Sequence, residues 1–399
     1  MPLVVPFRAM RFDPQVVGPL ESVTAPPYDV INEERRRELL TASRWSVVHL
    51  DLADGHHDPD HAESRYARAA SLLDRWLDEG AVRVEGRPAY WAYEMAGDSI
   101  RIRGVICALE LEPWGSGVLP HERTMPGPIH DRLALLRALR THLSPVYGTV
   151  AGPVEPLEEL LEQTAATSPD GEVTDPDGVR HRTWRLPDDV PIDEWLANLP
   201  LLIADGHHRY ETALRYRDER RGADGPGSWD RVLTLVVDAG VQDVPVLPFH
   251  RVLATGPLPA DGDEVSDPLI ALAALDDADV AAVAVCRSGD QMQVRVLRMS
   301  GEPPSVRALH ATYLARVEPA SIAYTPEAAA AVEEVRAGRA SVAYLLPPTT
   351  PDAVRAVVAD GHRLPAKSTL FWPKPRTGMV MMHLDPDEAG LTTPEAKPV

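Results

Sequence analysis

Apolar positions recur along this chain with two different periods. Between residues 60 and 80 they follow the helical spacing of about 3.6 residues and stop at Gly80, which predicts an amphipathic helix. Apolar runs at 46–52, 100–111 and 231–238 predict buried strands. Helical and strand patterns alternate over most of the chain, so the sequence predicts a mixed α/β fold.

A stretch rich in proline, glycine and aspartate at residues 255–268 interrupts this alternation. The chain has 399 residues, which is long for a single hydrophobic core. We therefore expect two regions, the first at 1–255 and the second, also of α/β character, at 256–399.

An apolar run at 199–204 leads directly into a turn and three large polar residues at 207–209. Gly206 lets the backbone approach a ligand closely, and the segment after it has helical spacing. The start of a helix attracts anions, because its first N–H groups and its dipole favour negative charge there. The pattern therefore predicts a phosphate site where a buried strand turns into a helix.

The side chains of this segment add chemistry to that prediction. His207, His208 and Arg209 supply hydrogen-bond donors, and the arginine can hold two phosphate oxygens at once. Asp205 can bind Mg²⁺ or orient a histidine. Two other interpretations stay open from the residues alone. One is a helix cap with a satisfied surface pair of histidines, and the other is a zinc site, which adjacent histidines without a cysteine cluster disfavour.

Charge and cysteine content narrow the class of protein. The formal net charge of −20 argues against a sequence-independent grip on DNA or RNA, because such binding needs a basic surface. Cys107 and Cys286 both lie in apolar runs, so we expect buried thiols rather than disulfides. We find no membrane-length apolar run and no signal peptide. We expect a cytoplasmic protein without nucleic-acid or membrane partners, and the sequence leaves the oligomeric state open.

Further polar residues stand out in loops and at strand ends. Glu122 follows His121 in a loop, where its carboxylate can take a proton from a substrate hydroxyl; a solvent-exposed loop acid is the alternative. Other candidates can contact phosphates or substrate, or belong to a basic surface. These are Asp29, His250, Arg251, Lys367, Ser368, Thr369 and Lys374. The histidine-rich stretch 54–61 is interpreted as a turn-rich loop rather than a metal site.

The stretch DGHHR resembles the phosphate-binding box of the ParB and sulfiredoxin superfamily. The archaeal free-serine kinases of that superfamily carry nearly the same stretch, and LPHERTM (119–125) and LPAKSTLFWPKP (364–375) resemble two of their other elements. The resemblance implies a ParB/sulfiredoxin-like nucleotide-binding core, with Glu122 as the base for the serine hydroxyl and the Lys-Ser-Thr segment gripping substrate or phosphate. It also implies ATP or ADP as the phosphate donor and Mg²⁺ as the cofactor.

The whole chain also resembles the bacterial domain-of-unknown-function 1015 family. Its marks are APPYDVI, HERT, DRLALLRAL with SPVYG, DGHHRYETA, LPFHRVL, and KSTLFWPK with RTG, in order from residue 25 to 378. The position of the sulfiredoxin cysteine holds His207 here, so sulfinic-acid repair is not expected, and ParB-type DNA-binding helices are not evident.

The function expected from these features is a nucleotide-dependent kinase of a small hydroxyl metabolite, with free L-serine as the first candidate. In that case Glu122, the box at 205–209 and Lys367–Thr369 should share one cleft, because each supplies a different part of one phosphoryl transfer. The alternatives are a nucleotide-binding regulator without kinase activity and a scaffold that has lost its chemistry.

Overall fold

The computed structural model describes residues 3–53, 62–122, 124, 126–289 and 291–384. Contacts between residues divide the chain into two units. Unit 1 consists of Met1–Leu119, Thr124–Asp243 and Pro373–Val399, and unit 2 consists of Pro120–Arg123 and Val244–Trp372. The boundary expected at residue 255 falls inside unit 2, just after strand β14 (His250–Leu253).

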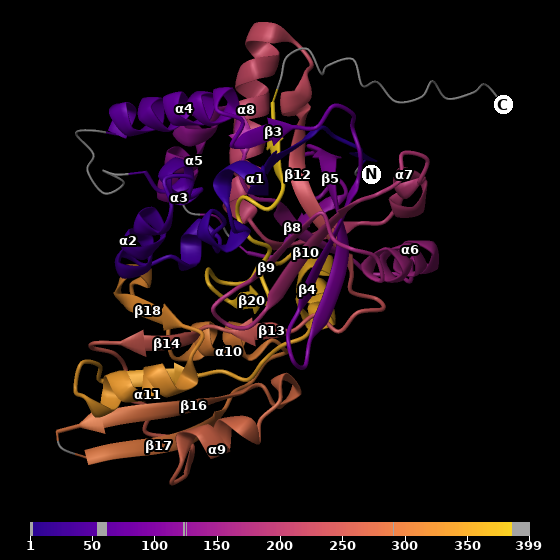
Figure 1. Ribbon diagram of the computed structural model, residues 1–399. Coiled ribbons are helices and arrows are strands. Elements are labelled where there is room, and N and C mark those ends of the chain that lie inside the picture. The colour runs from indigo at the N-terminus through magenta and orange to yellow at the C-terminus, as the bar shows by residue number, and fades with distance from the viewer. Residues whose placement is uncertain (1–2, 54–61, 123, 125, 290, 385–399) are drawn as a thin grey trace. The chain divides into compact units, whose positions relative to one another are not determined.

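Unit 1 is built on a nine-stranded mixed sheet (Figure 1). Strand β12 runs parallel to β8 and antiparallel to β5. In spatial order the strands are β6 (Val118–Pro120), β11 (Leu201–Asp205), β8 (Val146–Val150), β12 (Arg231–Asp238), β5 (Arg101–Glu110), β4 (Trp91–Ala96), β10 (Arg180–Arg185) and β9 (Gly171–Thr174), with β1 (Val4–Val5) paired to β5. The strands predicted at 100–111 and 231–238 are thus confirmed as β5 and β12, two neighbours in this sheet.

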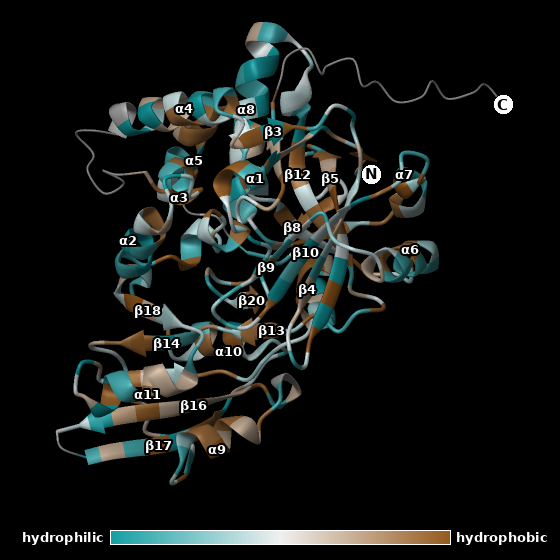
Figure 2. Ribbon diagram, viewed as in Figure 1, coloured by the Kyte–Doolittle hydropathy of each residue, from teal (hydrophilic) through white to brown (hydrophobic). Residues whose placement is uncertain are grey.

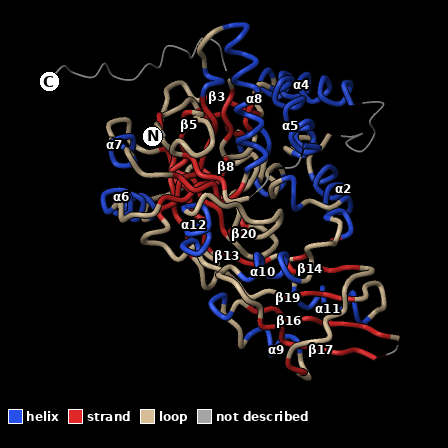
Figure 3. The backbone as a smooth tube through the Cα atoms, turned by 180° about the vertical axis from the view of Figure 1, so that it is seen from behind, coloured by secondary structure: helices blue, strands red, loops and turns tan. Residues whose placement is uncertain are grey.

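Helices flank the strands of this sheet on two sides. Helices α6 (Glu155–Ala165) and α7 (Ile192–Leu196) lie on one side, and α4 (Ala62–Asp78), α5 (Pro126–Leu139) and α8 (His207–Asp224) lie on the other (Figures 1 and 3). Figure 2 shows hydrophilic and hydrophobic segments alternating along α4, which is the amphipathic pattern predicted for 60–80. The shorter helices α1 (Pro14–Val17), α2 (Glu33–Ala42) and α3 (Val48–Asp51) precede them.

Helix α3 replaces the strand expected at 46–52. Val47, Val48 and Leu50 are buried as the apolar run requires, but the backbone is helical from Val48 to Asp51. A short apolar run bounded by turns fits a buried helical turn as well as a strand, and packing alone decides between them. The expectation of a strand was therefore wrong in type and right in burial.

A second sheet of unit 1 brings distant parts of the chain together. Its strand order is β3 (Val82–Val84), β2 (Ala9–Phe12), β21 (Met381–His383) and β7 (Thr141–His142). Just before β21, Thr377 forms a bridge with Ala25, and Arg376 Nη2 donates a hydrogen bond to the carbonyl oxygen of Thr24 at 2.9 Å. Unit 1 is therefore completed by a segment that enters it only after residue 372.

Unit 2 contains a six-stranded sheet and a two-stranded one. The six strands, in spatial order, are β15 (Asp263–Glu264), β17 (Gln291–Arg298), β16 (Ala281–Ser288), β19 (Val342–Leu345), β14 and β18 (Ile322–Thr325). Helices α9 (Pro268–Ala273) and α11 (Ala328–Arg336) pack on this sheet in one apolar cluster. Strand β13 (Val246–Pro248) pairs with β20 (Thr369–Phe371), and α10 (Ser305–Thr312) and α12 (Pro351–Ala359) complete the unit. Among the described residues, no helix combines the length and the apolar character needed to cross a membrane.

A close backbone approach in the nine-stranded sheet generates the first prediction. A Cβ atom at Gly104 would lie 2.4 Å from the carbonyl oxygen of Val236, whereas one at Gly222, on α8, would meet nothing within 4 Å. Gly104→Ala should lower the midpoint of thermal unfolding, because main-chain atoms must shift at a cost of about 1–3 kcal/mol. Gly222→Ala should raise the midpoint slightly, since alanine is the better helix former by about 1 kcal/mol. Equal effects of the two substitutions would contradict the sheet packing described here.

Candidate functional site

The turn between β11 and α8 has the form that the sequence predicts. Strand β11 ends at Asp205, Gly206 adopts a left-handed conformation with φ of 94°, and α8 begins at His207. A side chain at Gly206 would also crowd Arg209, whose Nη2 atom lies 3.0 Å from the position of a Cβ there. The left-handed backbone therefore favours glycine here, and the predicted sequence of strand, glycine and helix is confirmed.

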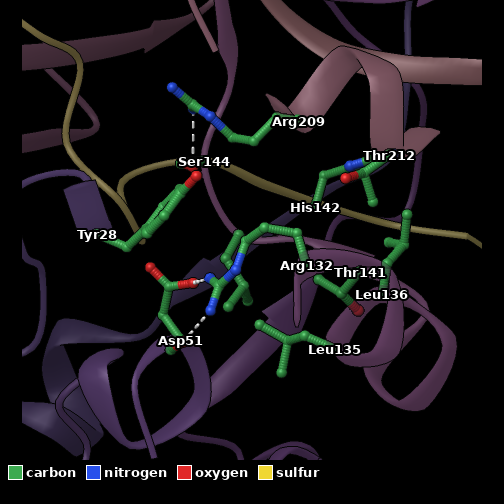
Figure 4. A pocket seen from close by; sticks show the side chains of 11 residues that line it. Tyr28, Asp51, Arg132, Leu135, Leu136, Thr141, His142, Ser144, Arg209 and Thr212 are labelled. Carbon is green, nitrogen blue, oxygen red and sulfur yellow. Dashed lines mark hydrogen bonds and ion pairs between the residues drawn. The ribbon is translucent and has the colours of Figure 1, made fainter. Parts of the chain in front are cut away.

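Arg209 lies in the first turn of α8 and folds back across the strand end. Its Nη2 atom forms an ion pair with Asp205 Oδ2, and its Nη1 atom donates hydrogen bonds to Ser144 Oγ at 2.9 Å and to the carbonyl oxygen of Pro145. Figure 4 shows the contact with Ser144. The guanidinium group therefore joins the start of α8 to the segment that leads into β8.

Asp205 is the centre of a four-residue charge cluster. Lys374 Nζ lies 2.5 Å from Asp205 Oδ1 and 2.9 Å from Asp29 Oδ2, while Arg209 takes the other oxygen of Asp205. Burial alone would raise the pKa of Asp205, but Lys374 and Arg209 hold that pKa well below its usual range. Burial lowers the pKa of Lys374, and the two carboxylates more than offset it, so that this pKa is raised. Asp205 and Lys374 thus both stay charged at neutral pH.

This cluster bears on the expected metal site. Both carboxylate oxygens of Asp205 already face cations, so a Mg²⁺ ion can reach them only if Lys374 or Arg209 moves away. Across the described ranges, no group of three or more His, Cys, Asp or Glu side chains is placed to hold a metal ion. Asp205 as a metal ligand therefore stays a prediction.

The two histidines of the box have different surroundings. His207 is buried, and its ring stacks on that of Trp114 with centroids 6.2 Å apart and an interplanar angle of 24°. His208, one residue later, is half-buried. His207 therefore contributes packing at this turn, and of the two only His208 keeps substantial exposure to solvent.

A cavity of about 50 Å³ in unit 1 adjoins Arg209 (Figure 4). Sequence reasoning assigned no role to most of its lining, although Tyr28, Arg132 and Ser144 belong to the motifs APPYDVI, DRLALLRAL and SPVYG. Those motifs were the sequence signal from which these lining residues could have been identified. The lining residues are Tyr28, Asp51, Arg132, Leu135, Leu136, Thr141, His142, Leu143, Ser144, Arg209 and Thr212.

Arg132 and Asp51 form the charged wall of this cavity. The Nη1 atom of Arg132 lies 2.5 Å from Asp51 Oδ1, and its guanidinium group lies 4.4 Å from the ring centroid of Tyr28. Burial raises the pKa of Asp51 although Arg132 opposes the shift, and burial raises the pKa of Tyr28 to about 12. Arg132 Nη2 also forms an ion pair with Asp131 at 2.6 Å, so the wall offers one arginine held by two carboxylates and one phenol that stays protonated.

In unit 2, Glu122 and the Lys-Ser-Thr segment lie together. Glu122 bridges to Leu364, and its Oε1 atom accepts a hydrogen bond from the backbone N–H of Lys367 at 2.9 Å. His121 Nε2 lies 2.7 Å from Thr369 Oγ1, which ties the loop to strand β20. Lys367 has a φ of 56°, unusual for a residue with a side chain, and its Nζ lies 5.4 Å from the ring centroid of Phe249.

The other candidates of unit 2 are mostly held by structural contacts. Ser368 Oγ donates to the carbonyl oxygen of Pro365 at 2.6 Å. His250 is buried, and its Nδ1 atom accepts a hydrogen bond from the N–H of Leu346 at 3.1 Å. Arg251 is also buried; its Nε atom bonds to His310 at 3.3 Å, and burial lowers the pKa of Arg251 to about 10.

The candidate residues thus form two groups, one within each unit. Unit 1 holds the box at 205–209 with Asp29 and Lys374, and unit 2 holds Glu122 with the Lys367–Thr369 segment. The single cleft expected to join them stays a prediction. The three histidines of 54–61 (His56, His57 and His61) lie outside the described residues.

Comparison with known proteins gives one family and several distant structures. The model of a family described as "Protein of unknown function (DUF1015)" matches residues 4–305. A free serine kinase in complex with AMP is similar at 14% identity with a TM-score of 0.38, covering 72% of this chain and 93% of that one. A conserved hypothetical protein from Pyrococcus furiosus (12%, TM-score 0.34, 68% and 93%) and SbnI with C-terminal truncation from Staphylococcus aureus (11%, TM-score 0.36, 67% and 84%) are also similar. No curated protein matches. Likenesses this distant carry no argument about activity, which is argued from the site itself.

Two buried histidines, His142 and His250, and the half-buried His310 predict how stability depends on pH. Burial lowers the pKa values of His142, His250 and His310 from 6.5 to about 4. Between these two values the unfolded chain binds more protons than the folded chain, so stability falls as the pH is lowered through this window. We expect the midpoint of thermal unfolding to fall as the pH is lowered from 6.5 to 4. This fall should be smaller in the His310→Gln variant than in the wild type. Parallel pH profiles of the two proteins would contradict the assignment.

Proposed function

This chain belongs to the DUF1015 family, and we propose that it is a nucleotide-dependent phosphotransferase that holds phosphate groups where β11 turns into α8. The acceptor in this proposal is a small hydroxyl metabolite, with free L-serine as the first candidate, and ATP or ADP is the donor. The observation that carries the proposal is a pair of cationic side chains, Arg209 (12% exposed) and Lys374 (10% exposed), at the first turn of a helix that no side chain caps.

An uncapped helix start and two fixed cations together make a phosphate site. The residue before α8 is Gly206, so the first turn receives no hydrogen bond from a capping side chain, and a phosphate oxygen can fill that role. Asp205 and Asp29 hold Lys374 in place, and Asp205 also holds Arg209. Cations fixed in advance stabilise the charge of a transferring phosphoryl group without reorganising during the reaction.

Asp205 is also the proposed Mg²⁺ ligand, with a condition set by the cluster. A bound nucleotide offers Lys374 and Arg209 alternative anionic partners, which would release the oxygens of Asp205 that they now engage. Mg²⁺ would then add positive charge beside the phosphates. The order in which Asp205 exchanges its partners is therefore part of the proposal.

Glu122 is the proposed general base, and its setting suits that role. Its Oε1 atom accepts a hydrogen bond from the N–H of Lys367, which fixes the orientation of the carboxylate. An oriented carboxylate can take the proton of the acceptor hydroxyl as the new bond to phosphorus forms. Lys367, on the same segment, is the proposed contact for the acceptor or for phosphate.

Arg209→Ala tests the phosphate site. We expect it to weaken nucleotide binding tenfold or more, since a charge-assisted hydrogen bond contributes about 1.5–3 kcal/mol. Arg215→Ala is the matched control, because Arg215 lies on the same helix and its half-exposed side chain pairs with Glu211 at the surface. Titration with ATP and ADP, followed by calorimetry, measures the affinities, and the unfolding midpoint without nucleotide checks that each variant is folded. Equal affinities of both variants would remove Arg209 from the site.

Glu122→Gln tests catalysis separately from binding. Loss of a general base should cut the rate of phosphoserine formation by about 100-fold and leave nucleotide affinity nearly unchanged. Glu318→Gln, an exposed substitution in the same unit, is the control. If Arg209→Ala weakens nucleotide binding while the wild type transfers no phosphate to serine or to other small hydroxyl compounds, the protein is a nucleotide-binding regulator rather than a kinase.

A further inference from the structure

Two buried polar atoms in the cavity beside Arg209 are left without a hydrogen bond. They are Nε2 of His142, on β7, and Oγ1 of Thr212, on α8, and neither atom has a partner among the described residues. The two residues are only 8% and 3% exposed. Buried polar groups in folded proteins nearly always have a hydrogen-bond partner. Two unpartnered atoms in the lining of one cavity therefore indicate that a bound molecule supplies the missing hydrogen bonds.

The other lining residues indicate which charge a ligand of this cavity would carry. Arg209 and Arg132 are the cations, and Asp51 is the acid, which is already engaged by Arg132. Arg209 lies close enough to affect three members of the lining. Burial raises the pKa values of Tyr28 and Asp51 and the charge of Arg209 opposes that rise, whereas burial lowers the pKa of His142 and the charge of Arg209 adds to that effect. The hydroxyl groups of Ser144 and Tyr28 are hydrogen-bond donors in addition to the N–H groups of the two arginines. Because burial lowers the pKa of His142 to about 4, its free Nε2 atom is an acceptor at neutral pH, whereas the free hydroxyl of Thr212 can donate. An oxyanion that keeps one hydroxyl, such as monohydrogen phosphate, can satisfy both atoms.

The size of the cavity sets the size of the ligand. A water molecule needs about 10–15 Å³ of such space, so a cavity of about 50 Å³ accepts a group with roughly the oxygen count of a phosphate. The apolar side chains of Leu135, Leu136 and Leu143 also line it, so polar groups form only part of its wall. A single tetrahedral oxyanion therefore matches both the volume and the donors.

We propose that this cavity is a second phosphate subsite, separated from the helix-start site by the guanidinium group of Arg209. The Nη2 atom of Arg209 faces Asp205, and its Nη1 atom faces Ser144, so one side chain serves both places. The ligand is a phosphate group, either free inorganic phosphate or the terminal phosphoryl group of a nucleotide. The inference deepens the proposed function and rests on it for the second of these sources, whereas binding of free phosphate requires no transfer.

Thr212→Val tests the subsite, because it removes the unpartnered hydroxyl and keeps the shape of the side chain. Thr149→Val is the matched control: Thr149 is likewise buried with an unpartnered Oγ1, but it does not line the cavity. Titration of the full chain with inorganic phosphate should show binding that is about tenfold weaker in Thr212→Val and unchanged in Thr149→Val. Titration with ATP and with AMP forms the second arm.

The arms separate the two sources. Loss of phosphate affinity in Thr212→Val supports a site for free phosphate, and loss of ATP affinity without loss of AMP affinity supports a site for the terminal phosphoryl group. A ¹⁵N NMR shift of His142 Nε2 on adding either ligand to the wild type gives a readout that needs no variant. If Thr212→Val changes neither affinity and the His142 signal stays fixed, the subsite does not exist. Phosphate binding without any phosphoryl-transfer activity would contradict the kinase proposal and still support the subsite.

Discussion

The carboxylate of Asp205 joins the parts of this structure on which the candidate site depends. It holds Arg209 through one oxygen and Lys374 through the other, and Lys374 in turn contacts Asp29. These residues come from the N-terminal, middle and C-terminal segments of unit 1. A buried ion pair rarely adds much net stability, because desolvation offsets the attraction, but removing one partner leaves an unpaired buried charge at a cost of about 3–5 kcal/mol. The cluster therefore acts less as a source of stability than as a constraint that fixes where three segments meet.

The same constraint explains why Arg209 faces two ways. Its guanidinium group is planar, and separate nitrogens bind Asp205 and the Ser144–Pro145 segment. A lysine at this position would supply a point charge without that fork. The position of the arginine is thus set by protein contacts before any ligand arrives, and both neighbouring sites depend on one orientation of one side chain.

Local pattern was enough to predict the elements that carry the site, and not enough to predict the cavity. The turn at Gly206 follows from an apolar run, a glycine and a helical period, all within about two dozen residues. The cavity lining spans residues 28 to 212 and is assembled by tertiary packing that no short-range period encodes. Lys374, Asp29 and Asp205 were each noted in the sequence as candidates, but their pairing was not, because nothing local relates residues so far apart. The prediction of a strand at 46–52 was wrong for a related reason. An apolar run indicates that a segment is buried, but packing against its neighbours decides whether the backbone is helical or extended.

The order of segments in unit 1 has a consequence for how the protein is made. Unit 2 occupies most of the chain between residues 243 and 373, so the ribosome releases it before the last strand of unit 1, β21, and before Lys374. Domains emerging from the ribosome generally fold as units, N-terminal parts first. Until residues 373–384 emerge, Asp205 and Asp29 lack the lysine that balances them, and β2 and β7 lack the strand that lies between them. The nascent chain therefore lacks the cation that contacts both of these carboxylates, and synthesis of the final segment supplies it.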